Sequence, residues 1–399
     1  MFENIIGHRN IITSLTESVI NRNLAPAMLF HGPRYSGKLS CALELARVLL
    51  CDNGKGEWQC RCSSCERQRL LINPNMLLLG SRNFDSEILS SADAYIKTKK
   101  SSTRYLFIRS VRKLLKQYDT VLWEGEEQKI KTIRPITLQI EELLSTINMG
   151  KDKFDENKKN DIKKITELCI KISSTSKSDN IPINQVRRAS FWAHISTQGT
   201  RKIIIFENAD KMLDSSRNSL LKILEEPPPE VFIVLLATRK GALIKTILSR
   251  VRPYYFRERL DEDKEKILKK IFHEESGEYK NLHDYFIAWR KLNPATLKSL
   301  AQRFIDLVIK NDNDVLEMQR EMEELLSRET DKYAIYLFVE ELFNLLRAGL
   351  NNSDYIKIGL SRIKKWSVLL RGAILDFEIF NINRMNIIES LYYKMKVAV

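Results

Sequence analysis

The stretch that most constrains the fold is a glycine-bounded turn between an apolar run and a helical pattern. The apolar run is Ala27–Phe30, and the turn carries Gly32, Gly37 and Lys38. This is the form of a phosphate-binding loop, Gly-x4-Gly-Lys-Ser/Thr, which joins a buried strand to a helix. Its glycines let backbone N–H groups point inward, the helix N-terminus adds partial positive charge, and the lysine can reach terminal phosphates. The alternative is a chance glycine turn.

One position of the loop departs from the pattern. The hydroxyl that should bind Mg²⁺ is replaced by Leu39, and Ser40 follows one residue late. We therefore expect the phosphate cradle without its metal ligand, which leaves open whether nucleotide still binds.

A second acidic motif follows a second buried strand. Lys202–Phe206 has four apolar residues bounded by charge, as is typical of a strand inside a parallel sheet. In P-loop ATPases an Asp for the Mg²⁺ shell comes next, followed by a Glu that activates water. Here Glu207 takes the first place and Asn208 the second. Because an amide cannot accept a proton, the catalytic base is missing as well.

Composition narrows the class of protein. A chain of 399 residues predicts two to three domains, and 43% hydrophobic with 29% charged residues is typical of a globular protein. The sequence has no signal peptide and no apolar run of roughly 20 residues, so we expect a cytoplasmic protein without a membrane partner. The net charge of +14 suggests an acidic partner such as nucleic acid, although a Lys-rich organism would give the same balance.

Four of the six cysteines lie within fifteen residues of one another, at Cys51, Cys60, Cys62 and Cys65. In a cytosolic protein such a cluster indicates a metal site more than a disulfide framework, and four thiolates can close a tetrahedral structural zinc site. The Cys60-Arg61-Cys62 spacing is tighter than the usual Cys-x2-Cys, so unligated thiols stay the alternative.

The rest of the chain alternates strands and helices and then becomes helical. Further apolar runs at Met76–Leu79 and Val231–Leu236, and a short one at 254–256, predict strands. Together with the phosphate-binding loop they indicate a parallel α/β sheet. From residue 260 onward only helical patterns recur, in two blocks divided near 310.

Residues 82 to 180 have a different character. A basic stretch with interleaved Tyr105 and Phe107 is followed by long helical patterns at 114–122, 136–147 and 162–172, and then by a polar linker at 173–180. The basic side chains could contact a phosphate backbone, but the solvated face of a helix is the simpler interpretation. They are Lys97, Lys99, Lys100, Arg104, Arg109, Arg112, Lys113 and Lys116.

Several strings, in this order, carry a resemblance to a known family. They are Ala25–Pro33, the cysteine cluster, Asn73-Pro74-Asn75, Asn218–Pro228, Thr246–Arg250 and, more weakly, Asn381–Asn383 with Ile388–Leu391. These strings resemble the clamp-loader subunits of bacterial DNA polymerase III, which are AAA+ proteins. Within them the likeness is to the delta-prime type, with the gamma/tau subunit as nearest relative. It covers roughly 1–80, 180–260 and more weakly the helical remainder, whereas residues 82–180 look like an insertion.

The resemblance implies an architecture of three domains. An AAA+ α/β domain with a parallel P-loop sheet would span 1–257 and include the zinc knuckle 51–65 and the helical insertion. A small helical lid would follow at 258–309. An all-α collar for oligomerisation would end the chain at 310–399.

The resemblance also implies a function and a set of sites. The family forms a hetero-oligomer of motor and delta-type subunits that opens the sliding clamp and places it on primed template DNA. Its ATP sites lie between subunits, and Arg250 matches the arginine finger that completes a neighbour's site. The nucleotide-contacting positions matched here are Gly32, Gly37, Lys38, Leu39, Ser40, Glu207 and, as first sensor, Thr238. A second sensor arginine would fall near 293–296, where the sequence has none.

These departures favour the delta-prime type. The motor subunit needs the loop hydroxyl, the acidic pair and the second sensor, whereas a delta-prime stator needs only the finger. We therefore expect no intrinsic ATPase, since a missing metal ligand and a missing base each slow the reaction. The alternatives are a gamma/tau motor subunit, a stand-alone P-loop phosphotransferase, and a plain nucleic-acid-binding zinc protein.

Overall fold

The computed structural model describes the chain in segments, and all structural statements below concern these residues. They are 1–80, 82–149, 154–175, 180–195, 201–274, 277, 279, 282–289, 294–310, 320, 333–351, 359–380 and 384–398. By its contacts the chain divides into two compact units, Met1–Phe286 and Ile287–Val399.

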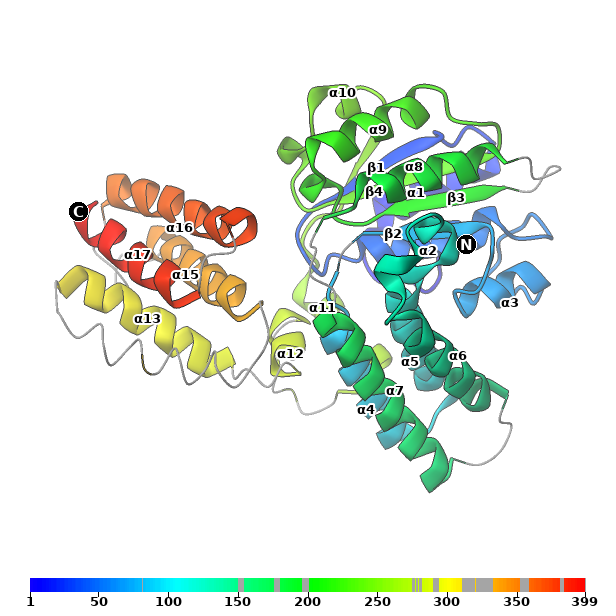
Figure 1. Ribbon diagram of the computed structural model, residues 1–399, viewed down its shortest axis with the longest axis horizontal. Helices are drawn as coiled ribbons and strands as arrows, with labels where there is room; N and C mark the ends of the chain where they lie inside the picture. Colours follow the sequence, from blue (N-terminus) through cyan, green and yellow to red (C-terminus); the bar gives the residue numbers. More distant parts are fainter. Residues whose placement is uncertain are drawn as a thin grey trace. The chain divides into compact units, whose positions relative to one another are not determined.

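A five-stranded parallel sheet forms the centre of the first unit, in the order β2-β3-β4-β1-β5 (Figure 1). The strands are β1 (Ala27–His31), β2 (Met76–Leu79), β3 (Lys202–Phe206), β4 (Val231–Ala237) and β5 (Arg252–Tyr255). In the register of the sheet, Leu29 lies opposite Leu235 on one side and Pro253 on the other. The four strands β1 to β4 are almost wholly buried, as their apolar runs predicted. The prediction of an α/β fold with a parallel sheet and a helical C-terminal part is confirmed.

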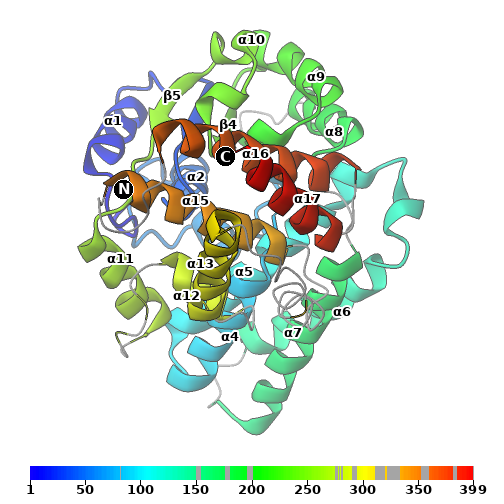
Figure 2. The same cartoon turned by 90° about the vertical axis from the view of Figure 1, so that its left-hand side faces the viewer.

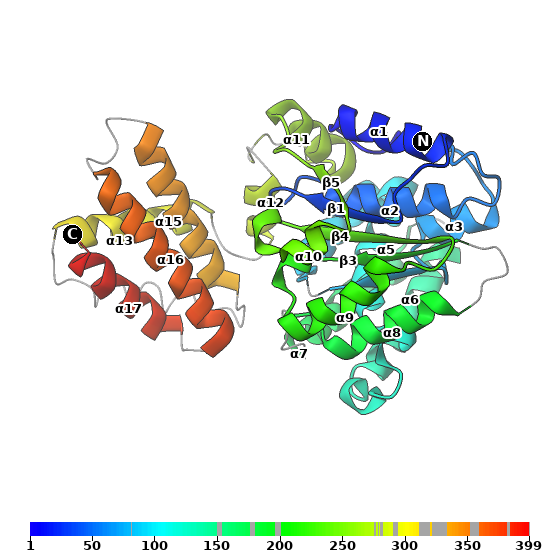
Figure 3. The same ribbon diagram turned by 90° about the horizontal axis from the view of Figure 1, so that it is seen from above.

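Alternate side chains of each strand enter different apolar clusters on the two faces of the sheet. Met28 and Phe30 pack with the helices that cover one face, whereas Leu29 belongs to the cluster on the other face. Figure 3 shows α2 and α9 on opposite faces. The helices of the first face include α1 (Arg9–Ile20) and α2 (Lys38–Leu49), and those of the second include α8 (Ile183–His194), α9 (Asp214–Glu225) and α10 (Lys245–Leu248).

Between β2 and α8 the chain forms a helical subdomain (Figure 2), and most of its buried apolar residues belong to the cluster on the first face. Its helices are α4 (Asp85–Thr98), α5 (Ser101–Leu115), α6 (Arg134–Met149) and α7 (Glu156–Thr175), with 3-10 turns at Lys116–Tyr118, Thr120–Trp123 and Glu127–Ile130. The expected helix at 114–122 is therefore wrong, because α5 ends at Leu115. The expected linker begins too early, since Ser173 to Thr175 still belong to α7; residues 176–179 lie outside the described segments.

Short helical segments complete the first unit. They are α3 (Ser63–Arg69), the 3-10 turns Ala209–Lys211 and Lys240–Ala242, α11 (Asp261–Ile267), a π-helical turn at Leu268–Phe272, and α12 (Leu282–Ala288), which crosses the boundary of the unit.

The second unit has its own core of helices. They are α13 (Pro294–Lys310), α15 (Tyr333–Asn351), α16 (Leu360–Phe380) and α17 (Arg384–Val397). Trp366 is fully buried at its centre and donates from Nε1 to Met395 O at 2.9 Å. The helix α13 packs into this core, and the lid–collar boundary at 309/310 stays a prediction. The division into three domains stays a prediction. Among the described helices, none is long and apolar enough to cross a membrane.

Candidate nucleotide-binding loop and metal site

The loop between β1 and α2 requires glycine at two positions. Gly32 has φ +149°, and a Cβ built on it would lie 1.9 Å from Phe256 O. Gly37 caps α2 with φ +94°, and its Cβ would lie 2.1 Å from Arg259 Nη2. The segment after β5 therefore packs directly against the loop. Gly32 is required by the close approach of the Phe256 backbone, and Gly37 by its left-handed backbone conformation.

The Lys38 ammonium group is turned toward its own loop. Its Nζ donates to Gly32 O at 2.6 Å and to Pro33 O at 2.5 Å. Burial, and then the nearby charge of Arg82, lower the pKa of Lys38 to about 8. The ammonium group thus closes the loop on itself through two of its own carbonyls.

The two residues after Lys38 provide no metal ligand. Leu39 is buried in the core of the first unit, and Ser40 is exposed. The helix turns by about 100° per residue, so the hydroxyl that comes one position late points away from the place of the missing one.

Glu207, in the place of the metal-binding acid, is already paired with an arginine. Arg82 Nη1 lies 2.9 Å from Glu207 Oε1, and the glutamate is 9% exposed. The same guanidinium lies 3.4 Å from Glu87 Oε2 through Nη2. With Leu39 in the core and Glu207 in an ion pair, these residues do not fit a bound Mg²⁺. No sequence motif pointed to Arg82, which stands 125 positions before its partner.

Thr238, the expected first sensor, follows β4 and is tied to a carboxylate of its own chain. Its backbone N donates to Asp210 Oδ2 at 3.1 Å, and its hydroxyl donates to the same oxygen at 2.5 Å. Asn208, in the place of the base, has a left-handed backbone with φ 54°. Asp210, which the sequence reasoning left out, thus holds the turn after β4 to the segment after β3.

Arg250, the expected arginine finger, lies after α10 with its side chain 32% exposed. Its Nη2 pairs with Glu225 Oε1 at 2.7 Å, and Nη1 donates to Thr246 O at 2.8 Å. Glu225 ends α9, so the two strings of the family resemblance meet through this ion pair.

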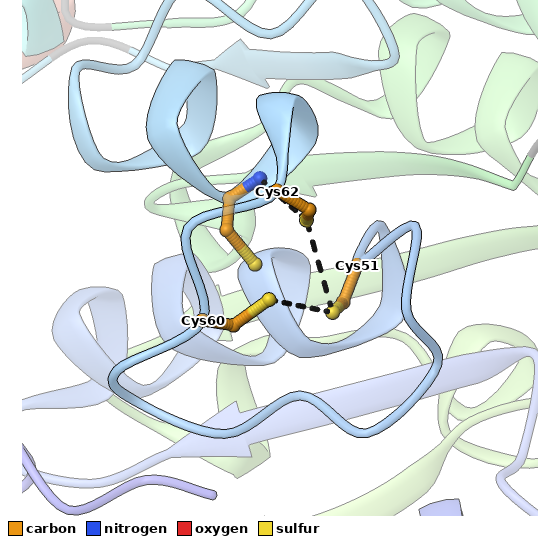
Figure 4. A group of neighbouring side chains, drawn as sticks. Cys51, Cys60 and Cys62 are labelled. Atoms are coloured by element: carbon orange, nitrogen blue, oxygen red, sulfur yellow. Dashed lines mark hydrogen bonds between the residues drawn. The ribbon is translucent and has the colours of Figure 1, made fainter.

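The four clustered cysteines come together, as their spacing predicted. Their sulfur atoms all lie within 4.8 Å of one another, with Cys51 Sγ at 3.7 Å from Cys60 Sγ and at 4.0 Å from Cys62 Sγ (Figure 4). A tetrahedral zinc ion with Zn–S bonds of about 2.3 Å places its sulfurs about 3.8 Å apart. The cluster therefore fits a four-coordinate metal ion such as zinc, held by Cys51, Cys60, Cys62 and Cys65. With all four positions taken by protein, the ion would stabilise the fold and bind no substrate.

Side chains around the cluster orient the sulfurs. Arg47 is buried and pairs with Glu44 at 2.7 Å, and its Nη1 donates to Cys65 Sγ at 3.3 Å and to Glu57 O at 2.9 Å. Although burial raises it, hydrogen bonds from neighbouring backbone groups, Cys65 N foremost, lower the pKa of the Cys62 thiol to about 7. A thiolate is the form that binds metal, so this shift favours the site.

Half of the basic stretch at 97–116 has a structural role that the sequence reasoning missed. Arg109 Nη1 donates to Arg69 O at 2.9 Å, and Arg112 Nη1 donates to Leu70 O at 3.0 Å. Both carbonyls lie at the C-terminal end of α3, the helix that carries Cys65. Cations are favourable at a helix C-terminus. Lys113 pairs with Glu87, and Lys116 with Asp119 at 3.1 Å. For these four residues neither a nucleic-acid face nor a solvated face is the right interpretation.

Two expected positions of the family resemblance are only partly described. Asn293 and residues 381–383 lie outside the described residues, Pro294 begins α13, and Ile388 and Leu391 are buried on α17.

Comparison with known proteins gives local similarities and one family. The family model described as DNA polymerase III, delta subunit, matches residues 7–259. DNA polymerase III subunit delta' of Buchnera aphidicola is 36% identical over 78 residues, 19% of this chain and 23% of that protein. The corresponding Haemophilus influenzae protein is 33% identical over 72 residues, 18% of this chain and 22% of that protein.

Two further similarities are to proteins with other descriptions. Protein STICHEL-like 3 of Arabidopsis thaliana is 31% identical over 106 residues, 26% of this chain and 10% of that protein. The crystal structure of a DNA polymerase III gamma subunit-related protein from Thermotoga maritima has 21% identity and a TM-score of 0.29, covering 56% of this chain and 81% of that one. The chain thus matches between a tenth and a quarter of the length of these curated relatives.

The family model covers more than half of the chain and includes the loop, the cysteine cluster and Arg250. The chain therefore belongs to the DNA polymerase III, delta subunit, family.

Proposed function

We propose that the chain is a delta-prime-type stator of a clamp loader, which does not hydrolyse ATP and supplies Arg250 to the ATP site of a neighbouring motor subunit. It would act in the cytoplasm with motor and delta-type subunits, the sliding clamp and primed template DNA. The cysteine cluster would hold structural zinc, and any nucleotide at its own loop would not be hydrolysed.

One contrast supports this proposal: the residues in the places of the metal ligands are engaged inside the chain, while Arg250 is accessible. Leu39 is buried in the core, and Glu207 is paired with Arg82. The Arg250 side chain is 32% exposed and forms an ion pair with Glu225. A guanidinium is always charged and can fork onto γ-phosphate oxygens, so it stabilises the charge that develops as the phosphate leaves.

The test is a reconstituted clamp loader that contains the Arg250→Ala chain with wild-type partner subunits. We expect assembly to be unchanged, and the DNA- and clamp-stimulated ATPase and clamp loading to fall. Arginine fingers in GTPases raise the rate about 10³–10⁵-fold. A loader with several ATP sites would lose only the part of the ATPase rate that the site at this interface contributes.

Arg257→Ala is the matched control, because Arg257 is an exposed arginine just after β5. Unchanged ATPase and loading with Arg250→Ala in an intact assembly would refute the finger assignment. Turnover by the purified chain alone, abolished by Lys38→Ala, would instead favour the gamma/tau motor or phosphotransferase alternatives.

A further inference from the structure

The guanidinium group of Arg250 is held by acceptors of its own chain. Its Nη2 lies 2.7 Å from Glu225 Oε1, and its Nη1 donates to Thr246 O at 2.8 Å and to Ser249 Oγ at 3.2 Å. These three acceptors engage both terminal nitrogen atoms. The two charged side chains stay open to solvent, 32% exposed for Arg250 and 48% for Glu225, so a group from outside the chain can reach the pair.

Both partners of this ion pair have fixed backbones, because α9 packs against α10 (Figure 1). Leu224 and Val251, the neighbours of Glu225 and Arg250 in sequence, are buried in the same apolar cluster. The helix cannot continue through the proline run that begins at Pro227, so Glu225 is its last residue. The parts of the pair that can move are therefore the two exposed side chains.

The place where Arg250 rests carries negative charge. Glu225 brings a full charge, and the C-terminal end of α9 adds the partial negative charge of its last carbonyl groups. A phosphate group can reach Arg250 only in competition with this carboxylate. Exposed arginine–carboxylate pairs are weak, whereas a guanidinium binds phosphate oxygens through two charged hydrogen bonds. A phosphate that is held close to Arg250 can therefore displace Glu225.

We propose that Glu225 competes with the γ-phosphate of a neighbouring subunit's nucleotide for Arg250. The guanidinium leaves the carboxylate when a triphosphate is bound beside it, and it returns when the γ-phosphate is lost. Glu225 thereby weakens the interface with a triphosphate-bound neighbour and has no such effect on the interface with a diphosphate-bound one. This inference rests on the proposed function of Arg250 and gives Glu225 a regulatory role at the same site.

The test measures the affinity of the full-length chain for the remaining loader subunits, once with a nonhydrolysable ATP analogue and once with ADP. The ratio of the two affinities reports the γ-phosphate contact, because a change in folding or in other subunit contacts affects both states and cancels. For Glu225→Gln we expect this ratio to rise about two- to fivefold, since an exposed competing pair contributes at most about 1 kcal/mol. A ratio equal to that of the wild type, or below it, would overturn the proposal.

Glu226→Gln is the matched control. Glu226 is exposed and carries the same charge one position later, just beyond the last residue of α9. This variant should leave the affinity ratio unchanged. An equal rise with Glu226→Gln would indicate a general effect of charge near the interface and would also overturn the proposal.

Arg250→Ala separates this inference from the proposed function. If Arg250→Ala leaves the affinity ratio at the wild-type value, the proposed function is refuted. If it lowers the ratio while Glu225→Gln leaves the ratio unchanged, the arginine finger stands and this inference alone is refuted.

The double variant shows whether Glu225 acts through Arg250. In the Arg250→Ala background, Glu225→Gln should change the affinity ratio no further, because the guanidinium for which the carboxylate competes is gone. A rise of the same size in both backgrounds would mean that Glu225 acts on the phosphate directly, and it would refute the proposal.

Discussion

At the scale of single residues, Lys38 shows how burial changes the chemistry of the loop. Burial and the charges of Arg82 and Arg34 lower its pKa to about 8 from the ordinary 10.5, and Asp210 and Glu207 oppose the shift. The folded chain therefore releases this proton at a lower pH than the unfolded chain does. From that sign it follows that the contribution of Lys38 to the free energy of unfolding rises with pH between about 8 and 10.5.

We expect the free energy of unfolding of the wild type to rise relative to that of Lys38→Met as the pH increases. The gain should be about 1–2 kcal/mol between about pH 7.5 and about pH 9.5, because each unit of pKa shift corresponds to about 1.4 kcal/mol. Urea unfolding at both values gives the difference, and all other titrating groups cancel between the two proteins. A difference that stays constant with pH would show that Lys38 is not shifted.

At the scale of helices and strands, α5 fixes the helix that carries Cys65. Arg112 donates to Leu70 O at 3.0 Å and pairs with Glu141 of α6 at 3.0 Å, with its side chain 8% exposed. One buried guanidinium thus joins α3, α5 and α6.

Arg112→Gln should lower the free energy of unfolding by about 2–3 kcal/mol, because hydrogen bonds to charged groups contribute about 1.5–3 kcal/mol each. Chemical denaturation measures the loss. Arg188→Gln is the control, and its exposed pair with Glu124 should contribute at most about 1 kcal/mol. If both variants are equally stable, the contact of α5 with α3 is not stabilising.

Strands β1 to β4 could be predicted from the sequence because nearly all their residues are apolar, whereas β5 (Arg252–Tyr255) starts two residues before the expected 254–256 and is mostly exposed. Met76–Leu79 and Lys202–Phe206 have the predicted bounds, and β4 differs by a single residue. A parallel strand buried on both faces needs no partner to be recognised, since its own composition carries the signal.

The charged parts of the site could not be predicted in the same way. Arg82 and Arg112 have the residue types of solvated surface, and only their long-range partners, Glu207 and Glu141, make them internal. Motif reasoning found the loop and the cysteines, whose spacing is local. It could not find ion pairs between residues far apart in the sequence, because side-chain charge alone does not tell which face of a helix is covered.

At the scale of the whole molecule, the chain has two units with separate cores. The cysteine cluster belongs to the first unit, whereas residues such as Leu342 and Trp366 form the core of the second. A bound metal should therefore stabilise only the first unit.

Calorimetry should show two unfolding transitions, and a zinc chelator should lower the midpoint temperature of only one of them. Cys62→Ser should reproduce the effect of the chelator. Leu342→Ala should lower the midpoint temperature of the other transition, which assigns that transition to the second unit. Metal analysis should find about one zinc per chain. Midpoint temperatures that are the same with and without the chelator would indicate four unligated thiols.

The strand order has a consequence for the sequence of events during synthesis. β1 pairs with β4 and β5, and β2 pairs with β3, so the two strands that are made first do not pair with each other. No ladder of the sheet can form until residue 202 and those after it have left the ribosome. Until then the nascent chain carries two apolar strands with open edges, a state that favours aggregation. The helices between β2 and β3 can fold on local contacts during this interval, and they then bring the ends of a long loop together before the sheet closes.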